Sequence, residues 1–85
     1  MSRSRATGDS PITWGKVMRI AGRKVRQGEG RSGLTYHVIQ DGAWQVAVET
    51  PRVRKTIGSA LMQDHALGLA VMWEQSVLRG RIDMS

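Results

Sequence analysis

The sequence predicts an α+β domain with the order α-β-β-β-α, in which helices pack on one face of a three-stranded antiparallel sheet. Two patterns predict it. Apolar and polar residues alternate along residues 34–49 and again along 52–57, as in half-buried strands. Apolar residues recur at helical spacing in the segments before and after these, residues 11–27 and 59–80.

The segment Leu34–Glu49 reads as a β-hairpin and is the best-defined part of the chain. A three-residue loop, Gln40-Asp41-Gly42 with Gly42 left-handed, would pair Ile39 with Ala43. That register places the bulky apolar residues on one face: Leu34, Tyr36, Val38, Trp44, Val46 and Val48. A two-residue turn would shift the pairing by one and split this set between the faces, so burial favours the longer loop.

Residues 11–27 can be a helix or strands. Ser10 and Pro11 suit a helix start, and the apolar residues at helical spacing are Trp14, Val17, Met18, Ala21 and Val25. A strand interpretation is open because Ile12, Trp14, Met18 and Ile20 alternate. The helix is favoured because its pattern separates apolar from charged residues. Gly28–Gly33 matches G-x-G-x-x-G, but a strand follows it rather than a helix, so it is expected to be a flexible connector.

The third strand is expected at Arg52–Ile57, with Val53 and Ile57 inward and Arg52, Arg54 and Thr56 outward. A last helix would start at Ser59 or Asp64 and end near Gly80. Its main apolar stripe should cover the hairpin and comprises Met62, Ala66, Leu69, Ala70, Trp73 and Val77. A second stripe, Leu67, Val71 and Leu78, lies roughly opposite and would be a partner interface, either in a homodimer or with a host or partner protein.

Eighty-five residues with a net charge of +6 and no cysteine make one small basic domain without disulfides. We expect a flexible basic arm at residues 1–9, a single domain at 10–80 and a frayed tail at 81–85. There is no apolar run of about 18 residues and no secretory signal, so a cytoplasmic protein is expected.

The positive charge is concentrated toward the N-terminus, where residues 3–31 hold eight basic and two acidic residues. This distribution indicates a polyanion partner, and the sequence predicts a small nucleic-acid-binding or regulatory protein, with DNA favoured over RNA. The residues expected to contact phosphate on one positive surface are Lys16, Arg19, Arg23, Lys24, Arg26, Arg31, Arg52 and Arg54. The alternative is a protein-protein interaction module, an inhibitor or adaptor, acting through the second helix stripe.

Catalysis is not indicated. His37 and His65 lie on different elements without metal-ligand spacing, and the carboxylates are scattered. We therefore expect no enzymatic activity, no catalytic residues, no cofactor and no metal site.

Two resemblances accompany these patterns. The α-β-β-β-α order resembles the double-stranded-RNA-binding domain, which contacts RNA through its first helix, its first hairpin loop and a lysine cluster at the start of its last helix; the matching residues here, Gln63-Asp64-His65, include no lysine. From Tyr36 to about Gln75, the runs Tyr36-His37-Val38 and Trp44-Gln45-Val46, an arginine-containing strand and an alanine-rich helix resemble a family of small uncharacterised bacterial domains with no assigned activity.

Overall fold

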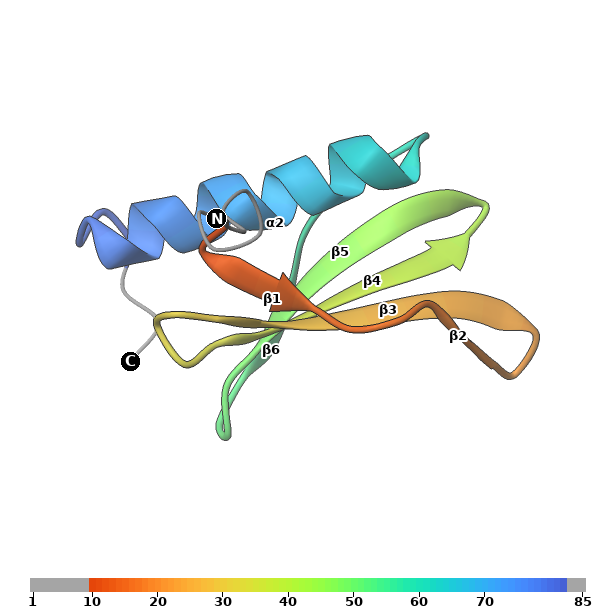
Figure 1. The fold of residues 1–85 in the computed structure, drawn as a ribbon, viewed down its shortest axis with the longest axis horizontal. Helices are drawn as coiled ribbons and strands as arrows, with labels where there is room; N and C mark the ends of the chain where they lie inside the picture. The colour runs from red at the N-terminus through yellow and green to blue at the C-terminus, as the bar shows by residue number, and fades with distance from the viewer. Residues whose placement is uncertain (1–9, 83–85) are drawn as a thin grey trace, which may run out of the picture.

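The computed structural model describes residues 10–82 and arranges them as one antiparallel sheet with a helix across one of its faces (Figure 1). The elements in chain order are β1 (Ile12–Trp14), β2 (Met18–Ile20), β3 (Arg23–Gly30), β4 (Thr35–Asp41), β5 (Ala43–Glu49), β6 (Arg54–Ala60) and α2 (Gln63–Leu78). The strand order is β1-β3-β4-β5-β6, and β2 pairs with the first half of β3. The predicted three-stranded sheet with helices at both ends of the chain is therefore wrong: the described residues form six strands and one helix.

The largest correction concerns residues 11–27, which are strands rather than a helix. β1 pairs with the second half of β3, and β2 turns directly into β3 through Ala21 and Gly22, whose φ angles are 54° and 81°. Two successive positive φ angles define a tight hairpin turn that suits the twist of paired strands. The helical spacing of the apolar residues in this segment was misleading. Val17 and Met18 are exposed, so these residues do not form one buried side.

The glycine-rich run is also structured, and the prediction of a flexible connector is wrong for its first half. Gly28 and Gly30 lie inside β3. A short turn, closed by a hydrogen bond from the Gly30 amide to the Leu34 carbonyl, leads into β4. A Cβ on Gly28 would collide with the Trp14 and Ile12 side chains, so both can lie against the bare backbone of β3. The glycine therefore permits close packing between β1 and β3.

The face assignment of the central hairpin is confirmed. The six predicted inward residues are all buried, with exposures between 0% and 6%, and Gly42 is left-handed with a φ of 77°. The pairing itself differs from the prediction by two residues, because Val38 lies opposite Val46 and Tyr36 opposite Val48. A shift of two residues keeps every side chain on its face, which is why the core was correct although the register was not.

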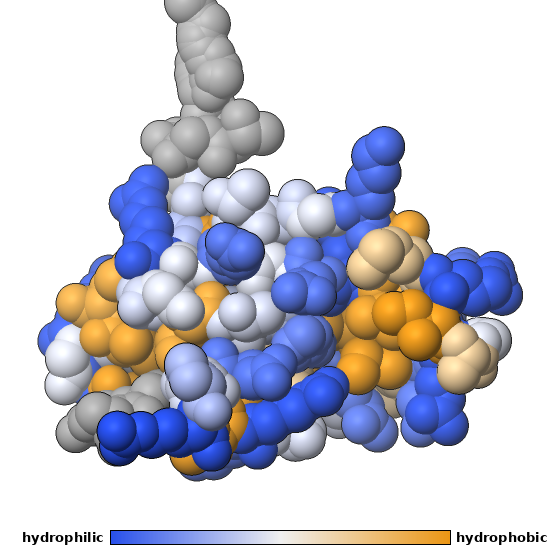
Figure 2. Space-filling view, turned by 90° about the horizontal axis from the view of Figure 1, so that it is seen from below, coloured by the Kyte–Doolittle hydropathy of each residue, from blue (hydrophilic) through white to orange (hydrophobic). Residues whose placement is uncertain are grey.

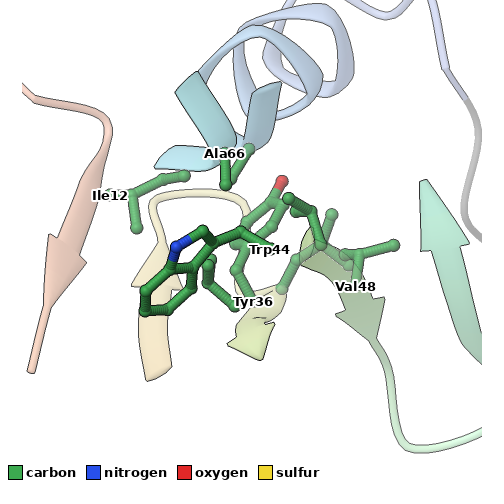
Figure 3. Close-up of a cluster of buried hydrophobic side chains, with 9 residues drawn as sticks. Ile12, Tyr36, Trp44, Val48 and Ala66 are labelled. Atoms are coloured by element: carbon green, nitrogen blue, oxygen red, sulfur yellow. The ribbon is translucent and has the colours of Figure 1, made fainter. Parts of the chain in front are cut away.

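The helix α2 lies over β4, β5 and β6 and covers this apolar face (Figures 1 and 3). Its fully buried residues Ala66, Ala70 and Glu74 are spaced four apart along the helix, and the two alanines let its backbone approach the strands. The helix starts at Gln63, after the predicted Ser59 and one residue before the predicted Asp64, because Ser59 continues β6. Met62, predicted to cover the sheet, is instead 57% exposed.

The third predicted strand corresponds to β6, shifted toward the C-terminus. β6 begins at Arg54, and Val53, which was expected to point inward, is 48% exposed in the turn before it. Ile57 is half-buried and packs against the core, as expected. The predicted arm at residues 1–9 and residues 83–85 of the predicted tail lie outside the described residues.

A buried carboxylate joins the helix to the sheet. The Glu74 carboxylate is fully buried and accepts three hydrogen bonds of 2.7 Å, from the Tyr36 hydroxyl, the Ser32 hydroxyl and the Ser32 backbone amide. Gly30 makes room for it, because a Cβ there would collide with the carboxylate. Burial, the hydrogen bond to Glu74 and its negative charge together raise the pKa of Tyr36 above its ordinary value.

Replacing Tyr36 by Phe should remove one of the three donors and leave a buried carboxylate under-satisfied. We expect Tyr36→Phe to lower the free energy of unfolding by about 1.5–3 kcal/mol, the cost typical of losing a hydrogen bond to a charged group. Urea unfolding followed by tryptophan fluorescence measures the change. Ser59→Ala, an exposed hydroxyl on β6, is the control; equal losses in the two variants would contradict the role of this cluster.

The raised Tyr36 pKa also predicts a pH dependence. The folded state holds the phenol neutral, so its contribution is complete below the unfolded pKa of about 10 and is lost as pH rises above it. The difference in unfolding free energy between the wild type and Tyr36→Phe should therefore shrink above pH 10, by at most about 1.4 kcal/mol per pH unit. Urea titrations between pH 8 and 11 test this, and a constant difference across the range would contradict it.

Candidate nucleic-acid interface

The predicted phosphate-binding residues occupy two opposite ends of the sheet. One group is at the β2–β3 turn and comprises Lys16, Arg19, Arg23, Lys24 and Arg26. The remaining three, Arg31, Arg52 and Arg54, lie at the other end, where the β3–β4 and β5–β6 turns are found. The structure therefore brings five of the eight residues together and places three elsewhere.

Residues 15–26, which we call the basic hairpin, carry five basic residues and no acidic residue. Lys16 is in the loop before β2, and Arg19 lies opposite Lys24 in the paired strands β2 and β3. All three are exposed, and none has an ion-pair partner within the described part of the chain. Arg23 lies 3.7 Å from Asp41, in a pair whose side chains are about half exposed (57% and 50%), so water largely screens it.

Arg26 differs from the other four because it is held by the fold. Its Nε donates to the Gly15 carbonyl at 2.8 Å, one Nη donates to the Gln63 side-chain oxygen at 3.2 Å, and its guanidinium lies 5.9 Å from the centre of the Trp14 ring. These contacts join the β1–β2 loop to the start of α2. Arg26 therefore adds positive charge to the basic hairpin while two of its donors are engaged in the protein.

The face of the sheet away from α2, here called the open face, is largely polar in its middle (Figure 2). The pairing of the four longest strands places these polar side chains on it: Gln27, Glu29, Thr35, His37, Gln45, Glu49, Arg54 and Thr56. His37 lies on this face, with its Nε2 2.7 Å from the Glu49 carboxylate. Residues 10–82 contain no group of three His, Cys, Asp or Glu residues able to hold a metal ion.

The second basic group has acidic neighbours. Arg54 lies opposite Glu49 on the edge of the open face, and Glu29 lies in the same row of the sheet. Arg31 is in the β3–β4 turn and Arg52 in the β5–β6 turn, and both are exposed. The positive potential is therefore weaker here than at the basic hairpin, which has no acidic residue of its own.

The predicted partner interface on the helix is only partly accessible. Leu67 and Val71 are half-buried and pack against the core, whereas Leu78 is 47% exposed. The three residues therefore do not form a continuous exposed face.

Sequence reasoning missed an apolar surface on the basic hairpin. Met18 and Ile20 are 47% and 54% exposed, and both lie on the open face, where Met18 is opposite Val25 and Ile20 opposite Arg23. The available signal was the alternation of Met18 and Ile20 with Arg19. It indicates a strand with an apolar and a basic side, and it was outweighed by the helical spacing.

Comparison with protein-family models, with curated proteins and with solved structures finds no match. The comparisons test neither resemblance noted from the sequence, but the α-β-β-β-α order on which the first one rests is not the order observed. Among the described residues, no helix is both long and apolar enough to cross a membrane.

The contacts of Arg26 predict a loss of stability that charge alone does not explain. Arg26→Lys keeps the positive charge but cannot reproduce both hydrogen bonds and the planar contact with Trp14, so we expect a loss of about 1–2 kcal/mol. Arg19→Lys, at an exposed position without described contacts, should change stability by less than about 0.5 kcal/mol. Urea unfolding of the two variants compares them directly; similar values would contradict the structural role of Arg26.

Proposed function

We propose that this protein binds nucleic acid through its basic hairpin and contacts the phosphate backbone with Lys16, Arg19 and Lys24. The observation that carries the proposal is a run of twelve residues, 15–26, at one corner of the sheet, with no acidic residue and five cations, of which four are exposed. When exposed cationic side chains neutralise phosphates, counterions condensed on the nucleic acid are released. This release supplies most of the affinity of non-specific binding. A cytoplasmic location and a regulatory role belong to the same proposal.

Two further observations support the assignment to this corner. Arg19 and Lys24 lie directly opposite each other, and like charges in that position destabilise a strand pair. An anion bound between them would relieve this repulsion. The repulsion itself does not stabilise the fold. The Asp41 carboxylate at this end of the sheet lies 3.7 Å from Arg23 and forms no ion pair with either of these two.

The alternative of a protein-interaction module through the helix has less support, because Leu67 and Val71 already pack against the core. An enzymatic role has no specific support either. His37 and Glu49 are a close pair on the open face, but neither residue lines the two cavities beside Trp14.

The proposal predicts salt-dependent binding that depends on the basic hairpin. Fluorescence anisotropy of a labelled 20-bp DNA duplex should show binding at about 50 mM salt that falls steeply as salt rises. The double variant Arg19→Ala/Lys24→Ala should reduce the slope of log K against log salt by roughly 2, since each lost phosphate contact lowers it by about 0.9.

The matched control is Arg79→Ala/Arg81→Ala, which removes the same charge beyond the end of α2. It should retain most of the slope. Equal losses in the two double variants would show that only net charge matters and would contradict a site on the hairpin. Absence of binding at low salt would refute the proposed function itself.

A further inference from the structure

The basic hairpin has two chemically different sides and a small tip. One side of the hairpin belongs to the sheet face that α2 covers, and there Arg19 lies opposite Lys24. On the open face, Ile20 lies opposite Arg23 at the position next to the turn. The turn consists of Ala21 and Gly22, and the space beside Gly22 is open, so no bulky group blocks the end.

The apolar side is an unpartnered surface. Ile20 is 54% exposed and Met18 47%, and with the half-buried Val25 and Ile39 they form an apolar patch at the hairpin end of the open face. Figure 2 shows apolar surface at this end with hydrophilic side chains around it. An exposed apolar patch with a charged rim is typical of an interaction site rather than of a surface left to water.

Charge determines what kind of partner suits this patch. A second copy of the chain would bring one group of five cations against another, and the Asp41 carboxylate beside each hairpin already pairs with that hairpin's own Arg23. The partner must therefore be anionic around the place where Ile20 and Met18 make contact, and it must offer apolar or stacked groups at that place. Duplex nucleic acid has this arrangement, with phosphates flanking grooves whose floor consists of base edges.

We propose that the β2–β3 hairpin enters the major groove of B-form DNA tip first; this rests on the proposed nucleic-acid function. In that position Arg19 and Lys24 reach the phosphates of one strand from one side of the hairpin. Arg23, whose exposed pair with Asp41 water largely screens, faces the other strand. Ile20 meets the base edges, where thymine methyl groups offer apolar contact. Ala21 and Gly22 allow the backbone to approach closely.

The groove dimensions decide between DNA and RNA. The major groove of B-form DNA is about 12 Å wide and admits a two-stranded β-ribbon. The major groove of an A-form RNA duplex is deep and narrow, and side chains cannot read it. The hairpin should therefore bind duplex DNA in preference to duplex RNA of the same sequence.

The test measures anisotropy with 20-bp duplexes of DNA and RNA of one sequence at about 50 mM salt, using the full chain. We expect DNA to bind at least about tenfold more tightly than RNA. Ile20→Ser should weaken DNA binding by roughly tenfold, the effect of losing one buried aliphatic contact, and leave the salt slope unchanged. Leu78→Ser, at a similarly exposed aliphatic residue at the far end of α2, is the control and should bind as the wild type does.

A second measurement locates the contact in the groove. Replacing thymine by uracil throughout the duplex removes only the major-groove methyl groups. It should weaken the wild type several-fold and have little effect on Ile20→Ser, because that variant has already lost the contact. Circular dichroism and urea unfolding should show that both variants fold, because the two substituted side chains are exposed.

The outcomes separate the two proposals. Equal binding to DNA and RNA, or unchanged binding by Ile20→Ser, would overturn groove insertion while salt-dependent binding through Arg19 and Lys24 stood. Failure to bind any duplex would overturn both. Ile20-dependent binding to vesicles of anionic lipid without DNA binding, or Ile20-dependent dimerisation in sedimentation velocity, would assign the patch to another partner and overturn the inference.

Discussion

The structure depends on the burial of one face of the β4–β5 hairpin beneath α2. Tyr36, Val38, Val46 and Val48 are completely inaccessible, and Ala66 and Ala70 let the helix lie close to them. The Glu74 carboxylate extends the same contact toward the β3–β4 turn, because its partners, Tyr36 and Ser32, belong to the sheet side. Removing this face from water supplies the main favourable term of folding, and the buried hydrogen bonds fix how the helix lies.

This burial also decides which surfaces remain for function. The helix covers β4, β5 and β6, so the basic hairpin at the β2–β3 corner contacts α2 mainly through Arg26 and Gln63. The cations of the hairpin can therefore stay solvated. The exposed Ile20 and Met18 lie in a part of the sheet that does not pack against the hydrophobic core. The proposed site is thus a peripheral ribbon on a rigid support, an arrangement suited to entering a groove without disturbing the fold.

The sequence reasoning succeeded and failed for identifiable reasons. The face of the central hairpin was predicted because strand side chains alternate strictly, and a pairing error of two residues leaves that alternation intact. Residues 11–27 were misassigned because their apolar residues fit both a helical and a strand spacing. The choice depends on pairing with residues outside this segment, of β3 with β4 and of β1 with the end of β3, which local spacing does not reveal. The buried Glu74 was missed because a single acidic residue in a helix normally faces water.

The sequence by itself determined the apolar set of the central hairpin, the helix that covers it and the concentration of positive charge before residue 27. These follow from local periodicity and composition, which need no partner segment to be read. Only the tertiary structure decided that the first segment forms strands, that the cations divide between two ends of the sheet, and that Glu74 is enclosed by Ser32 and Tyr36. Each of these depends on which strands pair across the sheet, and pairing is a property of the whole chain rather than of any one stretch of it.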